Sequence, residues 1–126
     1  RSCNLGSGEN LNIRKCGSAR CKEFCTRFIP SDLVYSAALD RYFPCINLDF
    51  PNVVNCKSQN VIYVITCAKC LLQYVGQTCV KLGVRFCTHR ACMSGKQYAS
   101  SCRRLYEHFS SGPCEGADHC IQILEK

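Results

Sequence analysis

The chain lacks any long hydrophobic run, and no stretch approaches the roughly 20 consecutive apolar residues that a membrane-spanning helix needs. The sequence therefore predicts no contact with a membrane. No apolar leader precedes Arg1 either, which counts against secretion only if the natural chain starts there. No internal repeat is visible beyond the recurrence of close cysteine pairs.

Acidic residues are also few. The chain carries 9 Asp and Glu against 16 Lys and Arg, for a formal net charge of +7. This balance favours an anionic partner, and nucleic acid is the usual one. A merely basic soluble protein is the alternative that charge alone leaves open.

Cysteine, in contrast, is abundant. Fourteen of 126 residues are cysteine, a usage typical of secreted disulfide scaffolds or of metal-binding intracellular domains. Two close pairs, Cys21/Cys25 and Cys67/Cys70, favour the second class, because each pair places two thiolates on one turn, where they suit tetrahedral ligation. A disulfide within so short a loop would be strained. The spacings therefore indicate zinc rather than disulfides.

The distribution of these residues predicts two parts. Residues 1–56 are polar, rich in cysteine and interrupted by prolines, and we interpret them as an irregular zinc-stabilised appendage. Cys16, Cys21 and Cys25 would supply three ligands. The fourth is ambiguous among Cys3, Cys45 and Cys56, and we prefer Cys56 because it directly precedes the first core strand.

Residues 57–126 predict a small α+β domain. The β-branched run Val61–Thr66 is typical of a strand covered on both faces. Cys67–Cys70 is short enough to be a hairpin connection, and residues 71–75 form the return strand, which Gly76 ends. Residues 102–110 predict a helix and residues 120–124 a last strand. The whole is an antiparallel three-stranded sheet flanked by helices.

A further helix is expected after Thr78, which is a plausible N-cap. Two stripes at helical spacing support it. One stripe is apolar and consists of Val80, Val84, Cys87 and Ala91. The other is basic and consists of Lys81, Arg85 and His89.

Two tyrosines, an arginine and a histidine follow one another around this hairpin and helix. Val61-Ile62-Tyr63 and Tyr74-Val75-Gly76, with the tyrosines 11 residues apart, resemble the two half-motifs of the GIY-YIG nuclease family. Arg85 stands where that family keeps a helix arginine, and His89 matches a histidine present in some members. Val61 replaces the usual glycine of the first half-motif.

The inserted Cys67/Cys70 pair narrows the resemblance to the endonuclease domain of Penelope-like retroelements, and Glu107-His108-Phe109, His119 and the upstream cysteine cluster agree with it. This resemblance implies that Tyr63 is the general base and that Tyr74 positions the water or the phosphate. It implies that Arg85 binds the phosphate and that His89 assists. It also implies a zinc site formed by Cys67, Cys70, His108 and His119.

The resemblance further implies a catalytic Mg²⁺ or Mn²⁺ held by a glutamate on a late helix. Neither Glu107, Glu115 nor Glu125 fits that position, so we expect the glutamate beyond Lys126 and the 57–126 domain to lack its C-terminal helix. The expected activity is nicking of DNA in the nucleus, which would prime reverse transcription of RNA by a reverse transcriptase upstream in the same polypeptide.

Basic residues are expected to hold the phosphate backbone with little base specificity. They are Arg14, Lys15, Arg20, Lys81, Arg90, Arg103 and Arg104. Two other classes stay open. A zinc-dependent nucleic-acid binding module without catalysis would explain the charge, the cysteines and the missing glutamate. A secreted disulfide-rich structural protein is the second.

Overall fold

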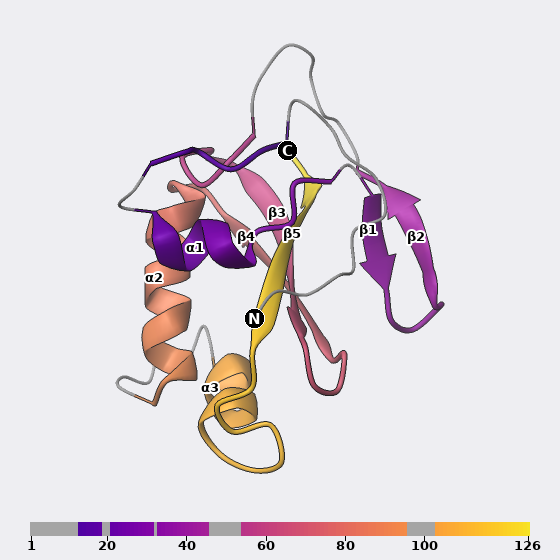
Figure 1. The fold of residues 1–126 in the computed structure, drawn as a ribbon, viewed down its shortest axis with the longest axis vertical. Helices are drawn as coiled ribbons and strands as arrows, with labels where there is room; N and C mark the ends of the chain where they lie inside the picture. The colour runs from indigo at the N-terminus through magenta and orange to yellow at the C-terminus, as the bar shows by residue number, and fades with distance from the viewer. Residues whose placement is uncertain (1–12, 19–20, 32, 46–53, 96–102) are drawn as a thin grey trace.

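The computed structural model describes residues 13–18, 21–31, 33–45, 54–95 and 103–126, and in these residues one helix is followed by four strands, two helices and a last strand (Figure 1). The strands are β1 (Leu33–Ser36), β2 (Arg41–Pro44), β3 (Val61–Cys67), β4 (Gln73–Thr78) and β5 (His119–Glu125). The helices are α1 (Lys22–Arg27), α2 (Leu82–Met93) and α3 (Arg103–Ser110). The predicted α+β class is confirmed.

The central sheet has the strand order β4-β3-β5, and both pairings are antiparallel. The middle strand is the predicted β-branched run, which is buried along almost its whole length because neighbouring strands pair with both of its edges and other elements cover its faces. The return strand is longer than predicted. Gly76 lies within β4, opposite Tyr63, and does not end it.

Helices cover one face of this sheet (Figure 1). The aromatic ring of Phe24 on α1 packs edge-on against Phe86 on α2, with ring centroids 5.3 Å apart, and stacks on Phe28 at the same distance. Phe28 also forms an isolated parallel bridge with Ile121 of β5. The N-terminal segment therefore shares its apolar core with the sheet, while the predicted domain boundary at residue 56 stays a prediction.

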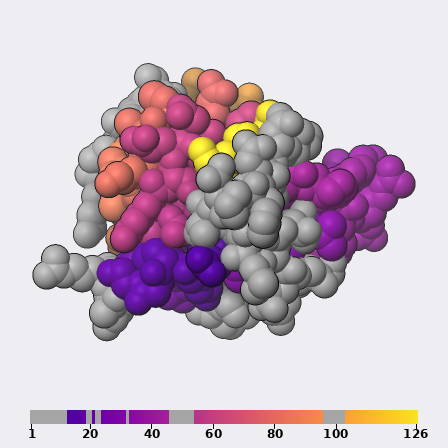
Figure 2. Space-filling view, turned by 90° about the horizontal axis from the view of Figure 1, so that it is seen from above, coloured from indigo at the N-terminus to yellow at the C-terminus, as the bar shows by residue number. Residues whose placement is uncertain are grey.

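Polar side chains join the β1–β2 hairpin to the other face of the sheet. Gln73 donates through Nε2 to the carbonyl of Tyr35 at 2.7 Å and to Oγ1 of Thr66 at 3.1 Å. Gln122 donates through Nε2 to the carbonyl of Leu33 at 3.2 Å. Figure 2 shows the segment 33–45 projecting at the right of the molecule.

The helix α2 presents a different face to the core from the one predicted. Its buried residues are Leu82, Phe86, His89, Cys92 and Met93. Val84 is 58% exposed and Cys87 is also exposed, so the predicted apolar stripe is wrong. Thr78 does not cap the helix; its Oγ1 accepts a hydrogen bond from the backbone N–H of Val80, and Lys81 occupies the N-cap position.

Among the described residues, no helix combines the length and the apolar character needed to cross a lipid bilayer.

Candidate functional site

Tyr63 and His89 meet in the core between β3 and α2. The hydroxyl oxygen of Tyr63 lies 2.5 Å from Nε2 of His89, and each residue is 1% exposed. Strand β3 aims the tyrosine at the helices because its side chain lies on the same face as Val61 and Ile65. A buried hydroxyl and a buried imidazole in contact form a unit that can pass a proton.

Two residues of β4 shape the space around this pair. A Cβ atom at Gly76 would lie 2.6 Å from both Cζ and the hydroxyl oxygen of Tyr63, so only glycine leaves room for the phenol. The ring of Tyr74 meets the ring of His89 edge-on, with centroids 5.6 Å apart. The two tyrosines of the sequence motif therefore both contact the same histidine.

Arg85, one helical turn before His89, brings positive charge to the pair. Burial raises the pKa of Tyr63, whereas a hydrogen bond from Arg85 and its charge act in the opposite direction. Within the described residues, Nε of Arg85 and Nδ1 of His89 are buried and have no hydrogen-bond partner. Arg85 also lines a surface pocket of about 590 Å³ together with Asn60, Val61 and Gln77.

The structure thus brings together all four residues that the resemblance placed in an active site: Tyr63, Tyr74, Arg85 and His89. The predicted phosphate-binding cations lie at the surface. Lys81 at the N-cap of α2 and Arg90 within α2 are exposed, as are Arg103 and Arg104 on α3. Arg14 and Lys15 are exposed near the N-terminal cysteines, and Arg20 lies outside the described residues.

His89 is held neutral. Burial first, and the charge of Arg85 second, lower its pKa from 6.5 to about 4. A lowered pKa in the folded state means that the unfolded chain binds the proton more tightly. The stability that His89 contributes is therefore fully present above pH 6.5 and is lost as the pH falls toward 4.

We expect this titration to lower the free energy of unfolding by about 2 kcal/mol between pH 7.5 and pH 5. Denaturant unfolding of the wild type and of His89→Gln over this range measures the effect. Taking the difference between the two proteins cancels the loss of any metal that both hold. A pH dependence that is the same in both would contradict the assigned pKa.

Four cysteines form a first candidate metal centre near the start of β3. They are Cys16, Cys21, Cys25 and Cys56, and their sulfur atoms lie within 4.8 Å of one another. Measured Sγ–Sγ distances are 3.3 Å for Cys21 to Cys56, 3.4 Å for Cys21 to Cys25 and 3.7 Å for Cys16 to Cys25. Tetrahedral zinc with bonds of about 2.3 Å separates its sulfur ligands by about 3.8 Å, so the cluster fits this ion.

A cation would have to displace the protons of these thiols. Burial raises the pKa of Cys25 to about 11, and it raises the pKa of Cys56 further. Four thiolates at this separation would repel one another strongly, and a divalent ion removes that cost. Cys56, which the sequence favoured as the fourth ligand, is in the group; Cys45 is not, and Cys3 lies outside the described residues.

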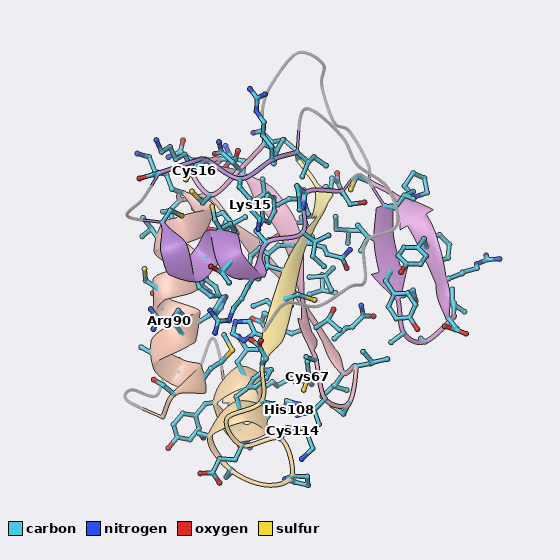
Figure 3. All side chains as sticks on the ribbon, in the orientation of Figure 1. Lys15, Cys16, Cys67, Arg90, His108 and Cys114 are labelled. Atoms are coloured by element: carbon cyan, nitrogen blue, oxygen red, sulfur yellow. The ribbon has the colours of Figure 1, made fainter. Side chains whose placement is uncertain are left out.

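A second group lies at the other end of β3. It consists of Cys67, Cys70, His108 and Cys114, again within 4.8 Å of one another. The Cys70 Sγ lies 3.4 Å from Nε2 of His108, close to the roughly 3.6 Å that a tetrahedral zinc would impose. Figure 3 shows Cys67, His108 and Cys114 gathered where the β3–β4 hairpin meets α3, far from Cys16.

The structure does not bring His119 into this group. The ring of His119 lies instead between the rings of Phe86 and Phe109, at centroid distances of 5.7 Å and 5.6 Å. Cys114 takes its place, since the turn after α3 returns the chain toward the hairpin. Sequence reasoning missed Cys114, although its position six residues after His108 was a usable signal.

Zinc content should separate the two ligand assignments. We expect two zinc ions per chain in the wild type, one in Cys114→Ser and two in His119→Gln, because only Cys114 belongs to a metal group. Elemental analysis of the purified proteins measures this. Loss of one zinc in His119→Gln with both retained in Cys114→Ser would contradict the structural assignment.

No group of carboxylates forms a site for a harder ion in the part of the chain that the structure describes. The two groups of three or more ligating side chains found there contain only cysteine and histidine. Mg²⁺ and Mn²⁺ prefer oxygen ligands. Among the described residues, therefore, no group of three or more ligating side chains offers the oxygen ligands of the catalytic metal site that the resemblance implied.

Comparisons of the chain with models of known protein families, with curated proteins and with solved structures found no match.

Proposed function

We propose that the chain is a GIY-YIG-type endonuclease domain that nicks DNA and is held together by two structural zinc ions. The contact between the Tyr63 hydroxyl and Nε2 of His89 carries the proposal. Arg85 and Tyr74 surround this contact, and the four residues stand in the order typical of that family.

The charge of Arg85 suits a phosphodiester. Its guanidinium can bind two phosphoryl oxygens at once and neutralise the charge that develops on them. Because Tyr63 is 1% exposed, a phosphate would approach from the side of Arg85, which lines the pocket beside β3 and β4.

The proton transfers follow from the Tyr63–His89 contact. Water attacks phosphorus and gives a proton to the oxygen of Tyr63, while the proton of Tyr63 passes to Nε2 of His89. The bond from phosphorus to the leaving oxygen breaks, that oxygen departs as an alcohol after taking a proton from solvent water, and His89 returns its extra proton to solvent. This relay needs neutral His89 with its own proton on Nδ1, and the lowered pKa of about 4 keeps the ring neutral at pH 7.

Among the described residues no carboxylate cluster offers Mg²⁺ or Mn²⁺ a site, and no step is assigned to such an ion. The same observation favours a second candidate function. A zinc-dependent nucleic-acid binding module needs the net charge of +7 and the two cysteine groups but no carboxylates.

A nicking assay on supercoiled plasmid distinguishes the two functions. We expect the zinc-loaded protein to convert supercoiled into open-circular DNA when Mg²⁺ or Mn²⁺ is added, and not in its absence. Salt-sensitive binding to the plasmid with no open-circular product under any of these conditions would favour the binding module.

The wider context is part of the proposal and rests on the resemblance alone. In a Penelope-like element, the nick would be made in the nucleus, and a reverse transcriptase in the same polypeptide would copy RNA from it.

A further inference from the structure

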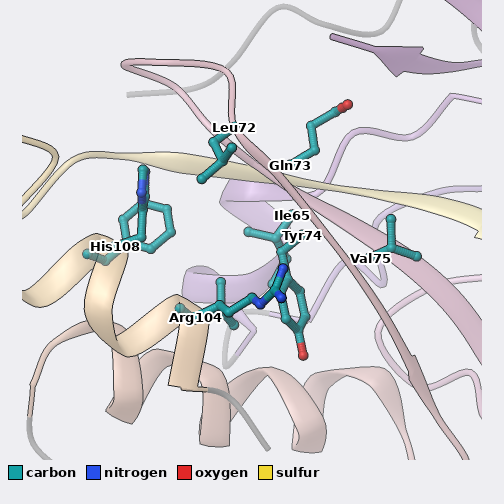
Figure 4. Close-up of a pocket in the computed structure, with 9 residues that line it drawn as sticks. Ile65, Leu72, Gln73, Tyr74, Val75, Arg104 and His108 are labelled. Carbon is teal, nitrogen blue, oxygen red and sulfur yellow. The ribbon is translucent and has the colours of Figure 1, made fainter. Parts of the chain in front are cut away.

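A second pocket opens between β4 and α3, on the far side of Tyr74 from His89. It has a volume of about 450 Å³, within the range of pockets that bind small organic groups. Its walls are largely apolar and include Ile65, Leu72, Val75 and Phe109, and Arg104 lines it from α3. Figure 4 shows the Arg104 side chain beside the ring of Tyr74.

The apolar character of this pocket is unusual for so basic a protein. Leu72 is 61% exposed. The ring of Tyr74 offers a flat surface for stacking, Leu72 adds apolar contact, and Arg104 adds a guanidinium that stacks on rings and binds phosphate. An aromatic ring system that carries a negative charge next to it fits this combination.

The position of the pocket further restricts the kind of ligand that it would bind. Tyr74 forms one wall of the pocket, and the edge of the same ring meets His89. Through Tyr74, a nucleotide whose base lies in the pocket would be next to the proposed catalytic residues. Stacking of its base on Tyr74 requires a base that is not paired within a duplex.

We propose that this pocket, lined by Tyr74, Val75, Leu72 and Arg104, binds an unpaired DNA nucleotide next to the phosphate that is cut. That this phosphate is cut rests on the proposed nuclease function, whereas binding of the unpaired nucleotide needs no catalysis. It assigns the protein a preference for DNA with an unpaired or extruded base.

The test is a binding experiment without added Mg²⁺ or Mn²⁺, so that nothing is cleaved. The probes are a fluorescein-labelled duplex with one bulged nucleotide and the same duplex fully paired, both followed by anisotropy. We expect the wild type to bind the bulged duplex about tenfold more tightly, since stacking one base contributes about 1–3 kcal/mol.

Two neighbouring arginines provide a matched control. Arg104 lines the pocket, whereas Arg103 forms an ion pair with Glu107 at 3.0 Å on the exposed surface of α3. Arg104→Ala and Leu72→Asp should reduce the preference for the bulged duplex to less than twofold. Arg103→Ala removes the same charge and should weaken both duplexes alike, leaving the preference unchanged.

Equal affinity of the wild type for the two duplexes would overturn the proposal, as would an undiminished preference in Arg104→Ala and Leu72→Asp. Circular dichroism melting of each variant shows whether it is folded. If the preference holds but plasmid is never nicked, the pocket stands and the nuclease function fails, so the two proposals are tested separately.

Discussion

Replacing Cys56 with serine is expected to release the metal from the N-terminal cluster and to loosen the first turn of α2. The backbone of the segment around Cys56 caps this helix. The carbonyl of Cys56 accepts a hydrogen bond from the N–H of Gly83 at 2.7 Å, and the carbonyl of Ser58 accepts one from the N–H of Leu82 at 2.9 Å. No side chain caps α2, so these carbonyls satisfy N–H groups that would otherwise be unpaired.

The loss of stability in Cys56→Ser should be large, because structural zinc contributes on the order of 10 kcal/mol to the folding of small domains. Arg85 and His89 lie on the same helix, only a few residues after this turn. Loss of the metal should therefore disturb the Tyr63–His89 contact as well as lower the melting temperature.

Zinc content, thermal unfolding and hydrogen exchange of the α2 amides measure these changes together. Cys87→Ser is the matched control, because Cys87 is an exposed cysteine on α2 that belongs to neither metal group. We expect it to keep both zinc ions and wild-type exchange. If Cys56→Ser kept two zinc ions, or lost one without faster exchange in α2, the coupling between the cluster and the helix would be wrong.

Arg85→Ala should lower the rate of DNA nicking by about 10²–10³-fold, the loss typical of removing one group that stabilises transition-state charge. Arg85→Lys keeps the charge but loses the two-pronged contact with phosphate, so we expect it to recover only part of that loss. The protein fold should survive both changes, since Arg85 is only half-buried.

The comparison with Arg90→Ala separates catalysis from attraction to DNA. Arg90 is exposed on the same helix, and its substitution should raise KM at low salt and leave kcat unchanged. Equal falls in kcat for Arg85→Ala and Arg90→Ala would mean that Arg85 has no special role at the reacting phosphate.

The sheet was predictable because its middle strand is a continuous β-branched run, and such a run is typical of a strand buried inside a sheet. The extent of β4 was not. Glycine normally weakens a strand, yet Gly76 lies within β4 because the ring of Tyr63 occupies the space of its missing side chain. That contact joins two strands and cannot be read from local sequence.

The face of α2 was mispredicted for a related reason. Counting apolar residues selected Val80 and Val84, which the structure exposes. The buried face contains His89, a polar residue that is stable there because it meets the hydroxyl of Tyr63. The apolar pattern gave no sign that four residues of this region lie close together in space. Their order along the chain did: Tyr63, Tyr74, Arg85 and His89.

The ligands of the two candidate metal groups were also only partly predictable from local sequence. Close cysteine pairs identified Cys21/Cys25 and Cys67/Cys70, because ligands on one turn are local. The ligands that come from elsewhere depend on tertiary structure. Cys56, preferred for its place before the first core strand, does lie in the first cysteine group, whereas the position of Cys114 depends on how the turn after α3 folds back.

The comparison of Tyr63→Phe with the wild type in the plasmid-nicking assay tests the central claim most directly. The substitution removes only the hydroxyl that contacts His89 and keeps the ring that packs against Gly76. We predict that the wild type nicks supercoiled DNA with Mg²⁺ or Mn²⁺, and that Tyr63→Phe, with the same zinc content, is slower by at least about 10²-fold. Equal nicking by the two proteins would show that Tyr63 is a core residue and that the chemistry lies elsewhere.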